Sequence, residues 1–299
     1  MKTRILFSVV AALSTAHVAY ATSTPAAAAR AVIDDDRSTR TLVIAHRACW
    51  REGAPENSLM AVRACERMGA DGVELDVHHT KDGVAVIFHD DTVDRMTNGT
   101  GKVIDLTWAQ LSRLRLREGA GGPNALLTRE HIPTLDAYLR VAKNRLLIVY
   151  DVKDWSQKPT FASIEKHGMA DQAIFFYECN NDRLLNNVRP FFDRVAMFPI
   201  MFEKDGPLAP MLERCPSHPL GRAHVKYQHT AWINDALPSL RAAHQRTWIA
   251  TMFPEDNAGF DDKRALADPA TVWGSQIDAG AQMIMTNEPR ALIAYLRRR

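Results

Sequence analysis

Short apolar, β-branched runs alternate along the chain with amphipathic stretches from Thr41 onward. Eight of these runs are strand-like, and they cover residues 41–45, 72–77, 146–152, 173–177, 195–202, 223–227, 247–252 and 282–286. Apolar residues at helical spacing lie between most of them, for example at 58–68, 161–167, 237–244 and 290–296. Strand–helix alternation implies parallel strands joined by helical crossovers. The pattern therefore predicts an α/β fold, a TIM-type (β/α)8 barrel over residues 41–299.

A further strand-like run, at residues 84–89, does not fit the barrel pattern. About six residues separate it from the run at 72–77, and they include a Lys-Asp-Gly turn. Because a parallel crossover needs roughly a dozen residues, we expect an antiparallel hairpin after the second strand. Residues from about 92 to 134 lack barrel strands. They predict a small insertion on the same face, the face on which barrel enzymes build their sites.

The first 21 residues have the pattern of a signal peptide. Two basic residues precede an apolar segment at 5–13, and residues 19–21 (AYA) have the small-x-small form of a cleavage site. Such an apolar segment is too short to span a bilayer as a helix, which needs roughly 20 residues; an uncleaved anchor is the alternative. The sequence predicts an exported protein, periplasmic or secreted, with residues 22–40 as a flexible leader that adds nothing to the core.

The composition is that of a globular protein, with 46% hydrophobic and 24% charged residues among 299. Lys plus Arg total 37 and Asp plus Glu total 35, and the basic residues of the signal segment account for the difference. A neutral mature chain argues against nucleic acid as a partner and against attachment to anionic lipid by charge. We expect a small-molecule partner and no stable membrane insertion, and the oligomeric state stays open.

Residues suited to catalysis or metal binding lie where the predicted strands end. In the second run two carboxylates are two residues apart, so both point to one side of the strand. If the barrel forms, three carboxylates, two histidines, an arginine and a lysine meet at one rim. They are His46, Arg47, Glu74, Asp76, His89, Asp151 and Lys153. Oxygen ligands alone favour one hard divalent cation, Ca2+ or Mg2+, over zinc.

A series of short motifs runs in order through most of the chain. The motifs are HR at 46, PEN at 55, ELDV at 74, KDG at 81, HD at 89, RMTNGTG at 95, YDVK at 150 and TNEP at 286. This series resembles the glycerophosphodiester phosphodiesterase family, densely over the first third and thinly afterwards. The resemblance implies a (β/α)8 barrel that binds a divalent cation. It also implies hydrolysis of glycerophosphodiesters to glycerol 3-phosphate and an alcohol.

The resemblance assigns the catalytic and metal-binding roles residue by residue. The acid–base pair falls on His46 and His89, and the cation falls on Glu74, Asp76 and Asp151. These roles agree with the chemistry, because cleaving a phosphodiester needs one group to activate a hydroxyl and another to protonate the leaving oxygen. Two imidazoles that titrate near neutrality can do both.

The substrate-binding roles fall on four further residues. Arg47 would hold the phosphoryl oxygens with Lys153 beside it, because charge on those oxygens needs fixed positive groups. Glu56 and Asn57 would contact the substrate, and the alternative is that Asn57 or Ser58 caps the helix that follows.

The chain departs from the family pattern at several site positions. Ala48 replaces a glycine, Asp151 stands where many members have Glu, and residues 249–252 (IATM) replace a frequent W-T-V-N. Ala48 adds a methyl group that restricts positive φ. Asp151 with Lys153 two residues later resembles a branch of the family, whereas the change at 249–252 removes an aromatic wall and leaves the substrate open. Candidates for a replacement wall are Trp50, Tyr150 and Phe253.

Two other functions compete with this hypothesis. One is a lipid-directed phosphodiesterase on the same barrel, similar to phospholipases C or D, which exposed rim aromatics such as Trp50 and Trp108 would favour. The other is a catalytically inactive binding protein, whose sequence would lack a site histidine or carboxylate.

The four cysteines allow three full pairings if disulfides form in an oxidising compartment. Cys65 falls on the inner face of the predicted helix at 58–68, which favours a buried free thiol. Cys49 lies beside the predicted site, but no base is placed by the sequence to activate it as a nucleophile.

Overall fold

The structure is a computed structural model that describes residues 23–153, 157–178, 181–215 and 221–299. Eight parallel strands close into a barrel in the order β1-β11-β10-β9-β8-β7-β6-β2, and β2 pairs with β1 to complete the ring. The strands are β1 (Leu42–Ala45), β2 (Gly72–His79), β6 (Leu147–Val152), β7 (Ala173–Glu178), β8 (Ala196–Phe202), β9 (Arg222–Lys226), β10 (Arg246–Ala250) and β11 (Met283–Thr286). This confirms the predicted (β/α)8 barrel and its eight strand runs.

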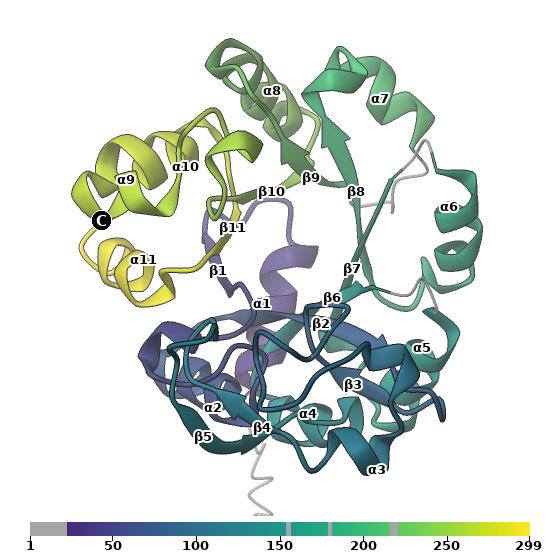
Figure 1. Cartoon of the computed structure of the whole chain (residues 1–299). Helices are drawn as coiled ribbons and strands as arrows, with labels where there is room; N and C mark the ends of the chain where they lie inside the picture. The colour runs from purple at the N-terminus through teal and green to yellow at the C-terminus, as the bar shows by residue number, and fades with distance from the viewer. Residues whose placement is uncertain (1–22, 154–156, 179–180, 216–220) are drawn as a thin grey trace, which may run out of the picture.

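Helices surround the ring of strands (Figure 1). They are α2 (Leu59–Met68), α4 (Leu135–Ala142), α5 (Gln157–Lys166), α6 (Asp182–Val188), α7 (Leu208–Arg214), α8 (Thr230–Ala242), α9 (Asp262–Ala267), α10 (Ser275–Ala279) and α11 (Pro289–Leu296). Strand residues alternate between two apolar layers: Val43 and Ala45 pack against the helices, whereas Leu42 and Ile44 pack inside the barrel. Along each strand, one set of side chains is therefore available to line the barrel interior.

The predicted hairpin and insertion follow the second barrel strand. Strand β3 (Ala85–Ile87) pairs antiparallel with β2, as expected from the short connection. The insertion contains α3 (Trp108–Leu111) and a two-stranded sheet of β4 (Arg115–Arg117) and β5 (Leu127–His131). The insertion and the hairpin share a separate apolar cluster, formed by Val86, Phe88, Val93, Met96, Val103, Leu111, Leu116 and Ile132. The segment is therefore a packed unit beside the barrel.

The prediction of a flexible leader at residues 22–40 is wrong for the part that forms a helix. Residues Pro25–Asp34 form helix α1, which begins at the N-cap Thr24 with a proline in its first turn. Its buried face is a stripe of small and apolar side chains, Ala26, Ala29 and Ile33. Ala29 and Ile33 pack against the interior residues of the barrel, and α1 is seen through the ring of strands in Figure 1. The segment therefore belongs to the core. The predicted signal peptide lies outside the described residues.

The expectation of a free thiol at Cys65 is also wrong, because Cys65 forms a disulfide with Cys49. The bond joins helix α2 to the loop that follows β1, and both cysteines are buried. A cysteine on the inner face of a helix is equally suited to a thiol or a disulfide, and the fold of the loop decides which forms. Cys215 is disulfide-bonded as well. In the described part of the chain, no helix has the length and apolar character needed to cross a bilayer.

Candidate active site

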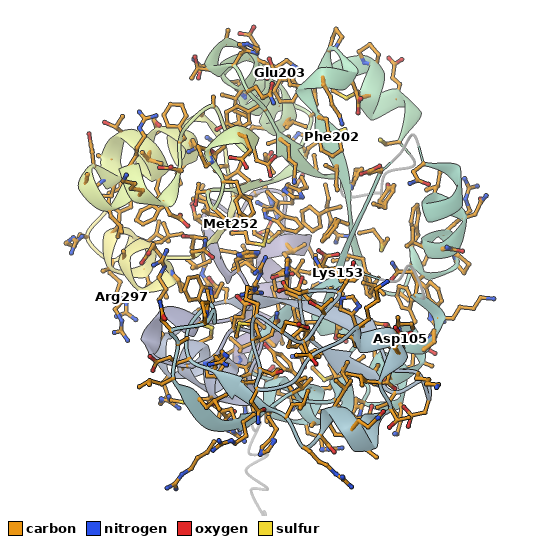
Figure 2. All side chains as sticks on the ribbon, in the orientation of Figure 1. Asp105, Lys153, Phe202, Glu203, Met252 and Arg297 are labelled. Carbon is orange, nitrogen blue, oxygen red and sulfur yellow. A yellow bond between two sulfur atoms is a disulfide. The ribbon has the colours of Figure 1, made fainter. Side chains whose placement is uncertain are left out.

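The seven site residues predicted at strand ends line one cavity of about 230 Å3. The register of the barrel brings them together, because Asp76 on β2 lies directly beside Asp151 on β6. Lys153 follows β6, His46 and Arg47 follow β1, and the hairpin returns His89 to the same end. Figure 2 shows Lys153 and Met252, which line this cavity, near the middle of the molecule.

Three carboxylates form the acidic side of the cavity. One oxygen from each of Glu74, Asp76 and Asp151 lies within 4.8 Å of the others, a set that could hold a metal ion. Lys153 Nζ lies 2.8 Å from Asp76 Oδ1 and 2.6 Å from Asp151 Oδ2. Burial, followed by repulsion from Asp76 and Asp151, raises the pKa of Glu74 well above its usual range. A cation bound among the three carboxylates would favour the ionised form of Glu74.

The two histidines are each oriented by a hydrogen bond at Nδ1. His46 Nδ1 lies 2.9 Å from Asn287 Oδ1, and His89 Nδ1 lies 2.7 Å from Asp90 Oδ1. An oxygen that accepts from Nδ1–H leaves Nε2 as the nitrogen available for proton transfer. Burial, followed by the neighbouring Arg47 charge, lowers the pKa of His46 to about 4, so its ring is neutral near pH 7.

His89 is linked through Asp90 to a series of ion pairs outside the cavity lining. Asp90 receives Arg95 Nε at 2.7 Å, and Arg95 Nη2 reaches Glu56 at 2.6 Å. Burial of Asp90 acts to raise its pKa, but hydrogen bonds from Arg95 and His89 outweigh this and lower the pKa to about 2. The carboxylate beside His89 therefore stays ionised, and a protonated His89 ring would have a charged partner where His46 has a neutral amide.

The structure places the two other predicted substrate contacts behind the cavity wall. Glu56 is buried and accepts from Arg47 Nη1 at 3.2 and 3.3 Å, and Asn57 Nδ2 donates to Asp76 Oδ2 at 2.7 Å. Neither lines the cavity, so their contacts hold Arg47 and Asp76 in place. Ser58, and not Asn57, caps helix α2. Arg47 Nε is buried without a hydrogen bond within the described structure, and its guanidinium lines the cavity.

The rest of the cavity wall comes from strands β7 to β11 and from the loop that follows β10. Its lining residues are Phe176, Ile200, His224, Lys226, Ala250, Met252, Phe253, Asp256 and Met285. Of the three aromatic residues predicted as a replacement wall, Phe253 lines the cavity, with its ring edge-on to His46 at 5.9 Å between centroids. Tyr150 is stacked on Phe175, and Trp50 lines a separate hollow.

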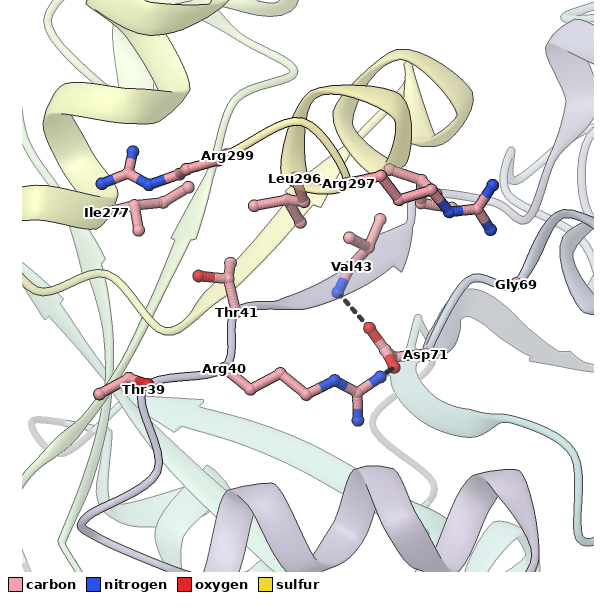
Figure 3. A pocket seen from close by; sticks show the side chains of 11 residues that line it. Thr39, Arg40, Thr41, Val43, Gly69, Asp71, Ile277, Leu296, Arg297 and Arg299 are labelled. Carbon is pink, nitrogen blue, oxygen red and sulfur yellow. Dashed lines mark hydrogen bonds and ion pairs between the residues drawn. The ribbon is translucent and has the colours of Figure 1, made fainter.

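Larger hollows exist elsewhere, but they lack this combination of groups. A hollow of about 500 Å3 lies at the opposite ends of the strands, where residues 39–43 lead into β1 (Figure 3). Its Arg40 is paired with Asp71, which also accepts from the Val43 backbone N–H at 2.9 Å. No histidine lines it, so the smaller cavity is the candidate active site.

Sequence reasoning missed several residues that complete the site. Asp90, Arg95 and Asn287 lie within the motifs at 89, 95 and 286, so the sequence held a signal for them as partners of the histidines. His224 and Lys226 lie in an ordinary strand-like run with no motif, and only the closed barrel turns them toward the cavity.

The fold and the site define a (β/α)8-barrel protein with two histidines beside an acidic cluster at the carboxyl ends of its strands. Residues 46–185 match the sequence model of the glycerophosphoryl diester phosphodiesterase family, and residues 208–296 match a domain of unknown function. Human glycerophosphodiester phosphodiesterase 1 is 42% identical over 130 residues, which cover 41% of this chain and 37% of that protein. A glycerophosphodiester phosphodiesterase of Caldanaerobacter subterraneus is 41% identical over 115 residues, which cover 38% of this chain and 46% of the relative.

Solved structures share the fold over nearly the whole chain. A glycerophosphoryl diester phosphodiesterase from Parabacteroides distasonis superposes with a TM-score of 0.71 at 22% identity, covering 90% of each chain. An Oleispira antarctica phosphodiesterase, solved in complex with the product sn-glycerol-3-phosphate, superposes with a TM-score of 0.63 at 20% identity, covering 88% of this chain and 99% of that one. Residues 46–185 of this chain are thus similar in sequence to the glycerophosphodiester phosphodiesterase family. The matches to the human and Caldanaerobacter proteins span less than half of their length.

Proposed function

We propose that this protein hydrolyses glycerophosphodiesters to glycerol 3-phosphate and an alcohol. The observation that carries the proposal is the convergence of His46, His89 and a three-carboxylate cluster in one cavity. A phosphodiester needs a base, an acid and positive charge around its oxygens, and this cavity offers all three. The names of the relatives support the same activity.

The hydrogen bonds around the two histidines favour distinct roles for them. His46 is neutral, with Asn287 at Nδ1, so its Nε2 suits the base that accepts a proton from the attacking hydroxyl. His89 has the Asp90 carboxylate 2.7 Å from Nδ1, which fixes the ring and leaves Nε2 as the nitrogen suited to the acid for the leaving oxygen.

The donor set fits one divalent cation, Ca2+ or Mg2+. All three candidate ligands are carboxylates, and repulsion from Asp76 and Asp151 adds to burial in raising the pKa of Glu74, which supports a bound cation. When bound, the cation would neutralise charge on the phosphoryl oxygens. Arg47 and Lys153 line the same cavity and would bind the remaining oxygens through their N–H groups.

The size of the cavity favours a small soluble diester over a lipid. Its volume of about 230 Å3 lies below the roughly 300–1,000 Å3 typical of pockets for drug-sized ligands. Among the rim aromatics, Phe253 is 40% exposed, whereas Trp50 and Trp108 are half-buried. An inactive binding protein is disfavoured, because none of the predicted catalytic or metal-binding groups is missing from the cavity.

Export to the periplasm or the medium remains part of the proposal. The Cys49–Cys65 disulfide supports it, because disulfides persist in oxidising compartments. N-terminal sequencing of the protein recovered outside the cytoplasm should find Thr22 as the first residue. Recovery of an intact Met1 from that fraction would contradict cleavage.

The proposal is tested by measuring glycerol 3-phosphate released from a panel of glycerophosphodiesters. We expect turnover that a chelator abolishes and that Ca2+ or Mg2+ restores. His46→Ala and His89→Ala should each lower kcat by roughly 100- to 10,000-fold without unfolding the protein. No glycerol 3-phosphate from any diester, or full turnover in metal-free buffer, would contradict the proposal. His131→Ala, an exposed histidine of the insertion, is the matched control and should keep full turnover.

A further inference from the structure

The wall of the cavity that faces the acidic cluster contains a buried histidine without a hydrogen bond. Strand β9 lies four places around the barrel from β2, on the opposite side of the ring. Of its residues, Ala223 and Val225 pack against the helices, which turns His224 and Lys226 inward. His224 is 3% exposed and lines the cavity, and both its ring nitrogens lack a hydrogen-bond partner within the described structure.

The ring of His224 is held in a fixed orientation by aromatic packing. It stacks on Trp248 with 4.0 Å between ring centroids and 9° between planes, and it meets Phe176 edge-on at 6.2 Å. Burial, followed by the nearby Lys226 charge, lowers the pKa of His224 well below its usual value, so the ring is neutral. A neutral imidazole offers one N–H donor and one acceptor nitrogen. Leaving both unpaired when buried is costly, which indicates a hydrogen-bonding ligand.

A second donor–acceptor pair lies nearer the rim on the same wall. Lys226 Nζ lies 2.9 Å from Asp256 Oδ2, and both side chains line the cavity. Together with His224, this wall presents both hydrogen-bond donors and acceptors, whereas Arg47 and the carboxylate cluster lie on the opposite wall. Hydroxyl groups, which both donate and accept, complement such a wall.

We propose that His224, assisted by the Lys226–Asp256 pair, recognises the glycerol hydroxyls of the substrate and makes the cavity selective for polyol phosphates. The inference rests on the proposed function for the position of the phosphate. These polar side chains take the place of the aromatic wall that the family pattern has at residues 249–252. In this chain Ala250 and Met252 line the cavity there, and neither is aromatic. His224 is thereby a specificity-determining residue and takes no part in proton transfer.

The test compares two ligands that differ only in their hydroxyls, glycerol 3-phosphate and propyl phosphate. Their dissociation constants are measured by calorimetry with the metal-loaded protein, for wild type and for His224→Phe, which keeps the aromatic stack and removes both nitrogens. We expect glycerol 3-phosphate to bind about ten-fold more weakly to the variant, the size of one lost hydrogen bond. Propyl phosphate should bind both proteins alike. His224→Gln, which retains a donor and an acceptor, should recover part of the affinity.

The outcomes separate this inference from the proposed function. Equal loss for both ligands in His224→Phe, or no loss for either, would overturn the polyol site even if the enzyme hydrolyses glycerophosphodiesters. Wild-type protein that releases no glycerol 3-phosphate and binds neither ligand would overturn the proposed function itself. Thermal unfolding of each variant confirms that the compared proteins are folded.

Discussion

The disulfide between Cys49 and Cys65 joins the loop after β1, which contains Arg47, to helix α2. The bond spans 16 residues of sequence and begins two residues after Arg47. Arg47 and Ala48 both have left-handed backbone, with φ of 53° and 63°. This conformation costs about 1–2 kcal/mol for each non-glycine residue, so the loop needs contacts that hold it. It directs the Arg47 N–H to Glu74 Oε2 at 2.8 Å.

The paired substitution Cys49→Ala with Cys65→Ala removes the tether and keeps both positions small and apolar. Closing a loop of this length lowers the entropy of the unfolded chain by an amount worth about 3 kcal/mol. We therefore expect the free energy of unfolding to fall by about 3 kcal/mol. Because the loop is then free to leave its left-handed conformation, we also expect kcat to fall by about ten-fold in the folded enzyme.

Urea denaturation followed by circular dichroism gives the free energy of unfolding by linear extrapolation. Turnover is measured in parallel without denaturant, where the variant is folded. Val62→Ala is the matched control, since it truncates a buried side chain of α2 and leaves the tether intact. An unchanged urea midpoint in the double alanine variant would refute the stability argument. Equal turnover in wild type, Val62→Ala and the double variant would refute the claim that the tether holds the loop.

Four further outcomes are expected. Asp90→Asn should lower kcat by about ten-fold or more, because His89 loses its charged partner, and an unchanged pH–rate profile would exclude this support. Asp151→Asn should raise the cation concentration for half-maximal activity by about ten-fold or more, and a titration that matches wild type would remove Asp151 from the ligands. Ile33→Ala should lower the free energy of unfolding by about 2–4 kcal/mol, and no loss would contradict the burial of α1. The pKa of His46 is lowered on folding from 6.5 to about 4, so the unfolded chain binds a proton first and stability falls as pH drops from about 6.5 to 4. By pH 5 this costs about 2 kcal/mol. Urea midpoints of metal-free His46→Gln should therefore fall less than those of wild type between pH 7 and pH 5.

The strands were predictable because buried parallel strands are short, continuous apolar runs, and helical crossovers fix their minimum spacing. The site followed from the same geometry. Glu74 and Asp76 must share a face of one strand, and the carboxyl ends of all barrel strands meet at one rim.

What could not be predicted depends on packing between distant segments. Helix α1 buries a narrow apolar stripe that includes Ala29 and Ile33. The stripe is too short to indicate a buried helix by itself, and its burial follows from packing against the barrel interior. The Cys49–Cys65 bond forms because the loop after β1 turns back over α2. The spacing of the two cysteines in the sequence does not predict that turn. His224 is a single histidine in a strand. Its ring nitrogens lack hydrogen-bond partners in the described structure because its ring packs against Phe176 and Trp248, which come from other strands.

The position of α1 sets the order in which this fold can be completed. Arg222 Nη2 donates to Asp34 Oδ1 across 188 residues of sequence, and Arg246 Nη1 donates to the Ser38 carbonyl across 208. Contacts of such separation carry a large loop-closure cost and form slowly. A helix of ten residues is marginal in water by itself, so α1 has no stable place until β9 and β10 have joined the barrel. Helix α1 is therefore made before the barrel strands and is buried only after β9 and β10 have formed.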